Sequence, residues 1–235
     1  MTIAVNEAEK KITCSECGAA IPWPASGSEA VAFEREHGMK CRARSESGTV
    51  FLDTESLSLA SDPGKSWSEV NKLGLACAVT YEAEYGWREW IGDHPGHPEA
   101  LAIYLDDAKK VIAHNAIRFD LPLIAGAVGI APEAFVAQFK GRVVDTWADV
   151  REATGRMVGL DALARGTLHR GKSGVGAVEV PRFWELGFRA EVLLYCRKDV
   201  ELLRDIYLAG IRGPLRYSAT AKAPGGTARV KWRLR

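Results

Sequence analysis

The stretch from Thr49 to Ser56, TVFLDTES, constrains the fold of this 235-residue chain more than any other. It is a run of strand-forming apolar residues that ends in two carboxylates, Asp53 and Glu55, with one residue between them. Because the side chains of a strand alternate between its faces, Asp53 and Glu55 share one face with Phe51, whereas Thr54 points the other way. Burying two acids is costly unless a basic group or a metal ion compensates them. The alternative is that the strand ends before Asp53 and that both acids are solvated.

The cysteines near the start of the chain predict a structural zinc site. The chain has five cysteines, an odd number that does not suit a disulfide framework. Cys14 and Cys17 form a CxxC turn, and His37 and Cys41 lie four residues apart on one face of a predicted helix. Four such ligands suit tetrahedral Zn²⁺, so residues 13–44 are expected to form a zinc-finger-like module that its metal stabilises. The alternative is chance thiols and a surface histidine.

The surroundings of this module leave its partner open. Lys40, Arg42 and Arg44 favour nucleic acid, but glutamates in the preceding helix leave the module nearly neutral, so contact with a replication or repair protein is the alternative. Residues 1–12 are polar and aperiodic, and we expect them to form a loosely ordered tail. Since no apolar run approaches the ~18 residues of a membrane span and no signal peptide is present, we expect a cytoplasmic protein without membrane contact.

From residue 49 onward the pattern is that of an α/β domain. A Ser-rich and Gly-containing linker at residues 45–48 precedes it, and the hydrophobic content of 47% is enough for a packed core. Strands come first as a group and then alternate with helices, which indicates a mixed sheet flanked by helices over residues 49–211. The pattern predicts strands at 73–81, 85–91, 111–114 and 143–146, and helices at 98–109, 119–128 and 188–208.

The C-terminal segment, residues 214–235, predicts a basic β-hairpin. Between Ile206 and Arg235 there are seven Lys or Arg residues and no Asp or Glu. The sequence ARVKWRLR alternates strictly and follows an APGG turn, so it reads as the second strand of a hairpin. Its basic face would comprise Arg229, Lys231, Arg233 and Arg235.

Two further acids stand at unusual positions. Asp120 follows a predicted strand and loop and opens a helix, where ordinary helix capping is the alternative explanation. Asp199 falls on the apolar stripe of the helix at 188–208, one turn after Tyr195, and no lysine or arginine shares that stripe. Together with Asp53 and Glu55 they make four acids without a base, a set that suits hard divalent cations, Mg²⁺ or Mn²⁺.

Three motifs in this order resemble those of the DEDD 3′–5′ exonucleases of the RNase H-like superfamily. They are DTE at Asp53 to Glu55, NxxxFD at Asn115 to Asp120, and YxxxDV at Tyr195 to Val200. The tyrosine marks the tyrosine subgroup (DEDDy), because the histidine subgroup would carry a histidine where this chain has Leu194. VVDTW at 143–147 and GLDALARGTL at 159–168 also resemble these nucleases. The resemblance covers roughly residues 49–208 and implies about five strands with the acids at the centre.

The resemblance also implies roles for single residues. Asp53, Glu55 and Asp199 would hold the ion that activates water, and Asp53 and Asp120 would hold a second ion, about 3.5–4 Å away. Tyr195 would orient the attacking water; core packing is the alternative for this residue. Substrate contacts would come from Thr54, Asn115, Phe119 and Lys172, with Asp145 supporting the site from behind.

The activity implied by this resemblance is metal-dependent 3′–5′ exonuclease activity. It would release nucleoside monophosphates from single-stranded or frayed ends, with DNA favoured over RNA. One alternative is an exoribonuclease of the same chemistry, since recognition of the 2′-hydroxyl depends on pocket detail. Another is a non-catalytic nucleic-acid-binding protein that uses the zinc module and the hairpin. Against it, all four acids and Tyr195 are present in the chain.

Overall fold

The chain divides into two compact units, residues 1–47 and 48–235, which are described separately. The computed structural model describes residues 3–6, 11–14, 20–22, 48–172, 176–219, 225–230 and 232. In the first unit, β1 (Ile3–Asn6), β2 (Lys11–Cys14) and β3 (Ala20–Pro22) form an antiparallel sheet in that order. The sequence predicts a loosely ordered tail at residues 1–12, whereas β1 lies in this range and pairs with β2, which begins in it and ends at Cys14.

The predicted zinc ligands fall almost entirely outside the described residues. Cys17, His37 and Cys41 are not among them, and Cys14 is described only through its backbone in β2. The zinc-finger-like module at 13–44 therefore stays a prediction.

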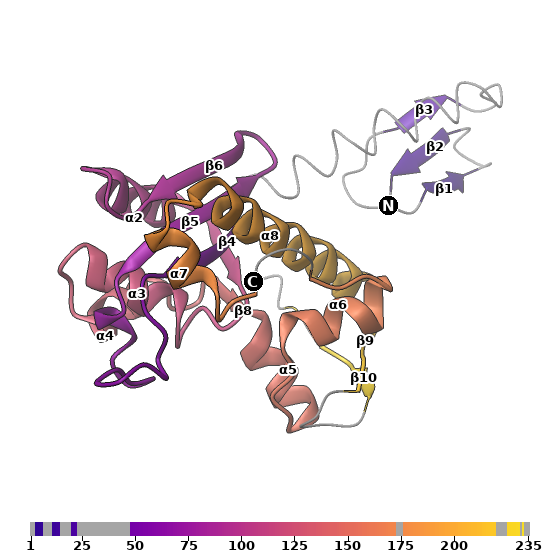
Figure 1. The fold of residues 1–235 in the computed structure, drawn as a ribbon. Helices are drawn as coiled ribbons and strands as arrows, with labels where there is room; N and C mark the ends of the chain where they lie inside the picture. Colours follow the sequence, from indigo (N-terminus) through magenta and orange to yellow (C-terminus); the bar gives the residue numbers. More distant parts are fainter. Residues whose placement is uncertain are drawn as a thin grey trace. The chain divides into compact units, whose positions relative to one another are not determined.

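The second unit is built on a mixed five-stranded sheet, as the sequence predicts (Figure 1). Its strands lie in the order β6-β5-β4-β7-β8, with β4 in the centre. The β4 strand pairs antiparallel with β5, which pairs antiparallel with β6, whereas the β4–β7 and β7–β8 pairs are parallel. The bounds are β4 (Thr49–Ser56), β5 (Leu75–Glu82), β6 (Gly86–Ile91), β7 (Lys110–Ala113) and β8 (Val143–Asp145).

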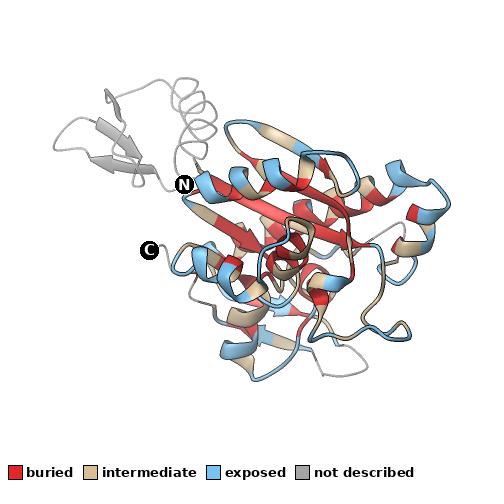
Figure 2. Ribbon diagram, turned by 90° about the vertical axis from the view of Figure 1, so that its left-hand side faces the viewer, coloured by how far each residue is buried: buried red, intermediate tan, exposed pale blue. Residues whose placement is uncertain are grey.

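Helices cover both faces of this sheet, so β4 is buried on both sides (Figure 2). Phe51 belongs to a core cluster with residues of α6, α7 and α8, while Val50 and Leu52 belong to a second cluster with residues of α2, α3 and α4. The side chains of β4 thus alternate between the two faces of the sheet, as the sequence predicts, and the core on each face is apolar. The helices are α2 (His97–Asp107), α3 (Asp120–Ala127), α4 (Pro132–Gln138), α5 (Thr146–Thr154), α6 (Leu160–Leu168), α7 (Val180–Glu185) and α8 (Arg189–Arg212), with a 3₁₀ helix η1 (Val70–Lys72).

The C-terminal hairpin forms, but earlier in the chain than the alternating basic residues predict. Strand β9 (Leu215–Tyr217) pairs antiparallel with β10 (Gly226–Ala228), which ends before Arg229. Tertiary packing explains the difference, because Trp232 is buried with its ring centroid 5.7 Å from that of Tyr207 on α8. Three members of the expected basic face lie outside the described residues: Lys231, Arg233 and Arg235.

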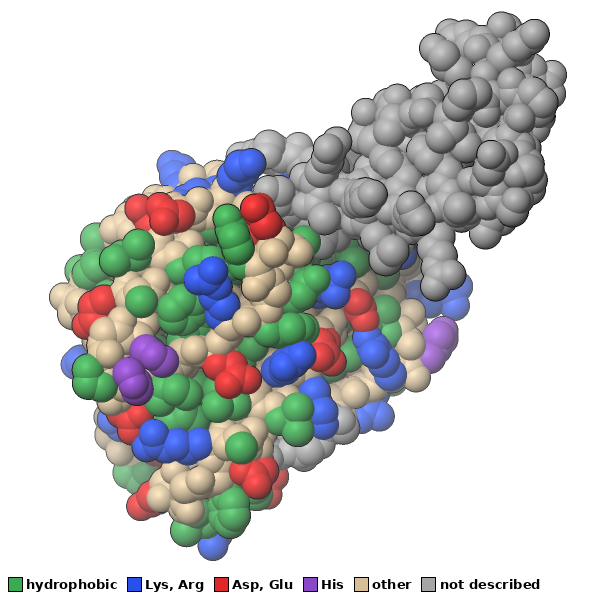
Figure 3. Space-filling model, turned by 90° about the horizontal axis from the view of Figure 1, so that it is seen from above, with side chains coloured by type: hydrophobic (Ala, Val, Ile, Leu, Met, Phe, Trp, Pro, Cys, Tyr) green, Lys and Arg blue, Asp and Glu red, His purple; other side chains and the backbone are tan. Residues whose placement is uncertain are grey.

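Within the described residues, no single helix combines the length and apolar composition needed to cross a membrane, and only the sharply bent pair α3 and α4 meets that test jointly. On the face drawn in Figure 3, the basic side chains are scattered among acidic ones rather than gathered in one patch. A polyanion that binds at this face of the described structure would therefore be attracted by individual basic side chains and not by a continuous basic patch.

Candidate active site

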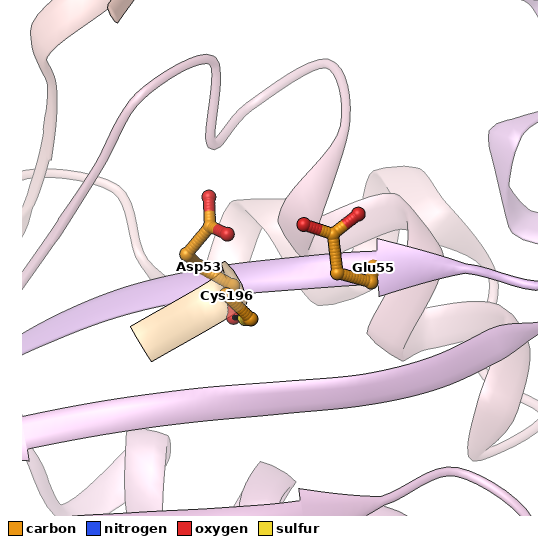
Figure 4. A group of neighbouring side chains, drawn as sticks. All are labelled: Asp53, Glu55 and Cys196. Carbon is orange, nitrogen blue, oxygen red and sulfur yellow. Dashed lines mark hydrogen bonds between the residues drawn. The ribbon is translucent and has the colours of Figure 1, made fainter. Parts of the chain in front are cut away.

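Strand β4 brings Asp53 and Glu55 to one face, where they meet Cys196 of α8 (Figure 4). One ligand atom from each of these three residues lies within 4.8 Å of the others. The thiol of Cys196 donates a hydrogen bond to the backbone carbonyl of Asp53, 3.3 Å away. The sequence places Cys196 on the buried stripe of its helix but gives no sign of its proximity to these acids, because the contact joins residues 143 positions apart.

The acids have a basic partner, contrary to the sequence-based picture of acids without a base. Lys172, in the segment after α6, forms an ion pair with the Asp199 carboxylate. Its ammonium also donates to the Tyr195 hydroxyl, 3.2 Å away, and its backbone N–H donates to Asp161 Oδ1 at 2.8 Å. The expectation failed because Lys172 lies on another segment, 27 residues before Asp199, and not on the helical stripe. The Lys172 ammonium, expected to contact phosphate, is therefore engaged with Asp199 and Tyr195.

Asp120 is held at the start of α3 by Thr54. The Thr54 hydroxyl donates to Asp120 Oδ1 at 2.8 Å, and the aspartate is only 2% exposed. Phe119 occupies the N-cap position, and no side-chain capping bond forms there, so ordinary helix capping does not account for Asp120. Thr54, expected to contact substrate, thus directs its hydroxyl to the neighbouring acid.

The acids raise one another's pKa values. Burial raises the pKa of Asp53 well above its ordinary value, and the charges of Asp199 and Asp120 raise it further. Burial, followed by the charge of Asp53, likewise raises the pKa of Glu55. Burial raises the pKa of Asp120 to about 7 although the Thr54 hydrogen bond acts to lower it. The site therefore favours added positive charge.

The residues fit a hard divalent cation. Asp53 and Glu55 offer oxygen ligands in the three-residue group, and the buried Oδ1 of Asp199 has no hydrogen-bond partner among the described residues. That group does not include Asp120 or Asp199, whose carboxylates bond to Thr54 and Lys172 instead. The described structure thus contains an acidic group compatible with a divalent metal.

Tyr195 stands one turn before Asp199 on α8 and is 4% exposed. Burial, followed by the negative charge of Asp199, raises the pKa of its hydroxyl above the ordinary value, although Lys172 acts to lower it. The hydroxyl is therefore protonated at neutral pH and can donate a hydrogen bond.

The loop that carries Asn115 and Phe119 is fastened by Asp145. The carboxylate of Asp145 accepts from the backbone N–H groups of Asn115 and Ile117, each at 3.0 Å. It also caps α5, accepting from two N–H groups of the first turn, each at 3.1 Å. Asn115 itself has a φ of 80°, a left-handed conformation that asparagine tolerates better than most residues. Asp145 was expected to support the site, and its position before a helix is the sequence signal for its capping role.

Replacing Asp145 by Asn is expected to lower the free energy of unfolding by about 1–3 kcal/mol. An amide keeps one acceptor oxygen but places an NH₂ group against an N–H that now donates to Asp145, so that donor loses its partner beside the buried Asp145 side chain. Urea unfolding of both proteins measures the difference. Asp149→Asn, in the first turn of the same helix, serves as the control for charge. Equal unfolding midpoints for Asp145→Asn and the parent protein would contradict the described clamp.

Comparison with known proteins shows a likeness at the level of the fold. No protein-family model matches the chain, and no curated protein matches it. Among solved structures, the chain resembles the family B DNA polymerase from the hyperthermophilic archaeon Pyrobaculum calidifontis, with a TM-score of 0.52 and 12% identity. The match covers 69% of this chain and 24% of the polymerase chain. Together with the mixed five-stranded sheet, the likeness shows an α/β fold of the RNase H-like type.

Proposed function

We propose that this chain is a divalent-metal-dependent 3′–5′ exonuclease of the tyrosine-containing DEDD type. It hydrolyses phosphodiester bonds at the 3′ ends of single-stranded or frayed nucleic acid, with DNA favoured, and releases nucleoside monophosphates. The observation that carries the proposal is the group formed by Asp53, Glu55 and Cys196, with Asp199 and Asp120 close enough to raise the Asp53 pKa.

In this proposal the four acids hold two ions, Mg²⁺ or Mn²⁺. Asp53, Glu55 and Asp199 would bind one, and Asp53 and Asp120 the other. Such ions, when bound, supply a nucleophile at neutral pH and stabilise the negative charge that develops on the phosphoryl oxygens. The zinc ligands Cys14, Cys17, His37 and Cys41 remain a separate proposal for a structural metal.

Tyr195 would orient the attacking water rather than remove its proton. The raised pKa keeps its hydroxyl protonated, so it can donate a hydrogen bond to an oxygen beside Asp199 but makes a poor base at neutral pH. Lys172 would fix both partners, because its ammonium contacts the Tyr195 hydroxyl and the Asp199 carboxylate together. It would therefore act as a positioning residue.

The chain's likeness to part of a DNA polymerase supports an enzyme that acts on nucleic acid and, more weakly, the preference for DNA. The sugar preference has to be measured, because a nuclease of this chemistry can act on either polymer.

A degradation time course with end-labelled strands tests the function. Single-stranded DNA and RNA, each labelled once at the 5′ end and once at the 3′ end, are incubated with Mg²⁺, Mn²⁺ or a chelator. A 3′–5′ exonuclease gives a ladder of shortened 5′-labelled products, and immediate release of a labelled mononucleotide from the 3′ end. Chelator should stop both. Shortening from the 5′ end, internal cuts alone, or equal activity in chelator would refute the proposal.

A further inference from the structure

A tryptophan that packs against the residue before Asp120 is exposed to solvent. Trp67 lies in the loop between β4 and η1, and it is 61% exposed. Its ring packs against Phe119, with ring centroids 6.1 Å apart and an angle of 52° between the planes. An exposed aromatic ring held by a second ring is a fixed, flat, apolar surface.

Trp67 forms part of the wall of a cavity of about 510 Å³. Ile117, which is 42% exposed, and Arg118 line it from the loop that leads to Asp120, and Pro122 and Pro132 line it from α3 and α4. The cavity is fixed relative to the candidate active site at two points. Asp145 holds the Ile117 N–H, and Thr54 holds Asp120, the residue directly after Phe119.

Both cations and acids line this cavity, namely Lys72 and Arg118 and the carboxylates Glu69 and Glu133. Arg118 lies over the ring of Trp147, 5.5 Å from its centroid, and forms no ion pair with a carboxylate within the described part of the chain. Lys65 donates to the backbone carbonyl of Lys72, while Lys72 itself is paired with Glu69. The guanidinium of Arg118 thus lies on an aromatic surface and can still donate hydrogen bonds to a phosphate.

We propose that Trp67 is a stacking platform for an unpaired nucleobase of the bound strand, within the last three nucleotides, with Arg118 contacting the adjacent phosphate. The assignment of the strand's end to this place rests on the proposed function. A flat aromatic surface suits a base, and stacking does not depend on the sugar or on base identity. The occupant is therefore single-stranded DNA or RNA, bound without sequence preference at this position.

Binding is tested with fluorescently labelled dT₈ and U₈ in chelator, where no hydrolysis is expected, by fluorescence anisotropy. Trp67→Ala should weaken binding ~5- to 100-fold, and Trp67→Phe should retain most of the affinity, because alanine removes the stacking surface and phenylalanine keeps one. Tyr85→Ala, which removes a ring that is 58% exposed on another part of the unit, should bind as the parent protein does. Equal thermal midpoints for all variants exclude a folding effect.

A scan with abasic nucleotides locates the contact. One base is removed at each of the last four positions of dT₈ in turn. The parent protein should lose affinity most at one of the last three positions, and Trp67→Ala should lose this positional difference. The inference is overturned if Trp67→Ala binds both oligonucleotides as the parent protein does, or if its abasic profile is the same.

The two proposals fail in different ways. Binding that depends on Trp67 in a protein without metal-dependent hydrolysis would leave the stacking platform standing and remove the proposed function. Metal-dependent hydrolysis by the parent protein, together with unchanged binding by Trp67→Ala, would support the proposed function and refute the stacking platform. A preference for dT₈ or U₈ that is equal in parent and variant would assign the choice between these two strands to residues other than Trp67 and support its sugar-independent role.

Discussion

Replacement of Asp53 by Asn will lower the rate of hydrolysis at least ~10³-fold at saturating Mg²⁺, which corresponds to about 4 kcal/mol of transition-state stabilisation. The charges of both Asp199 and Asp120 raise the pKa of Asp53, which fits its proposed place as the ligand shared by both ions. Asparagine keeps the shape of the side chain but removes its charge. The measurement is the initial rate on end-labelled single-stranded DNA. Asp107→Asn, an exposed acid at the end of α2, is the matched control.

The same substitution will raise the stability of the protein in chelator. Burial and neighbouring carboxylates raise the pKa of Asp53, so the folded state binds its proton more tightly than the unfolded state does. Stability associated with this group is therefore full below its unfolded pKa of about 3.8 and falls as pH rises toward the folded pKa. Thermal unfolding in chelator at pH 5 and pH 8 should show a smaller loss for Asp53→Asn than for the parent protein. An equal loss of thermal stability between pH 5 and pH 8 in both proteins, or an unchanged rate of hydrolysis, would contradict the role assigned to Asp53.

Replacement of Lys172 by Met will destabilise the protein in chelator by about 2–3 kcal/mol and slow hydrolysis ~10- to 100-fold. Removing one partner of a buried ion pair leaves the other charge uncompensated, and the Asp199 side chain is only 3% exposed. The effect is placed below that of a fully buried pair because the Lys172 side chain is 30% exposed. Burial acts to lower the pKa of Lys172, but Asp199 and Asp53 raise it above its ordinary value, so its charge persists at pH 8.

Mg²⁺ or Mn²⁺ should raise the thermal midpoint of Lys172→Met more than that of the parent protein, because the ions replace the missing positive charge. Lys140→Met, an exposed lysine after α4, controls for the loss of charge alone. If Lys172→Met and Lys140→Met have the same thermal midpoint in chelator, the contact of Lys172 with Asp199 contributes nothing to stability. That result would also contradict the role of Lys172 as a positioning residue.

The sequence predicts what depends on local patterns. The alternation at Thr49 to Ser56 places Asp53 and Glu55 on one face, and the helical stripe buries Asp199, because both patterns follow from backbone geometry alone. Contacts between distant segments carry no such signal. The bond from Thr54 to Asp120 joins residues 66 positions apart, and Lys172 reaches Asp199 from another segment.

The hairpin shows how a strong local pattern can be overridden. The alternation of ARVKWRLR predicts a strand, but β10 ends at Ala228, and Trp232 packs on α8 instead. Trp67 was missed for another reason. A tryptophan in a loop is equally compatible with a core contact and with exposure, and only the three-dimensional structure shows which of these holds.

The packing of Trp232 on α8 links two positions that lie far apart in the chain. A Cβ atom added at Gly210 would lie 1.9 Å from the indole nitrogen of Trp232, well inside van der Waals contact. Trp232 is in turn 7% exposed and fills the space that the glycine leaves. A side chain gained at position 210 therefore requires a smaller one at position 232. In related chains these positions should change together, and the change would be transmitted along the same helix that carries Tyr195 and Asp199.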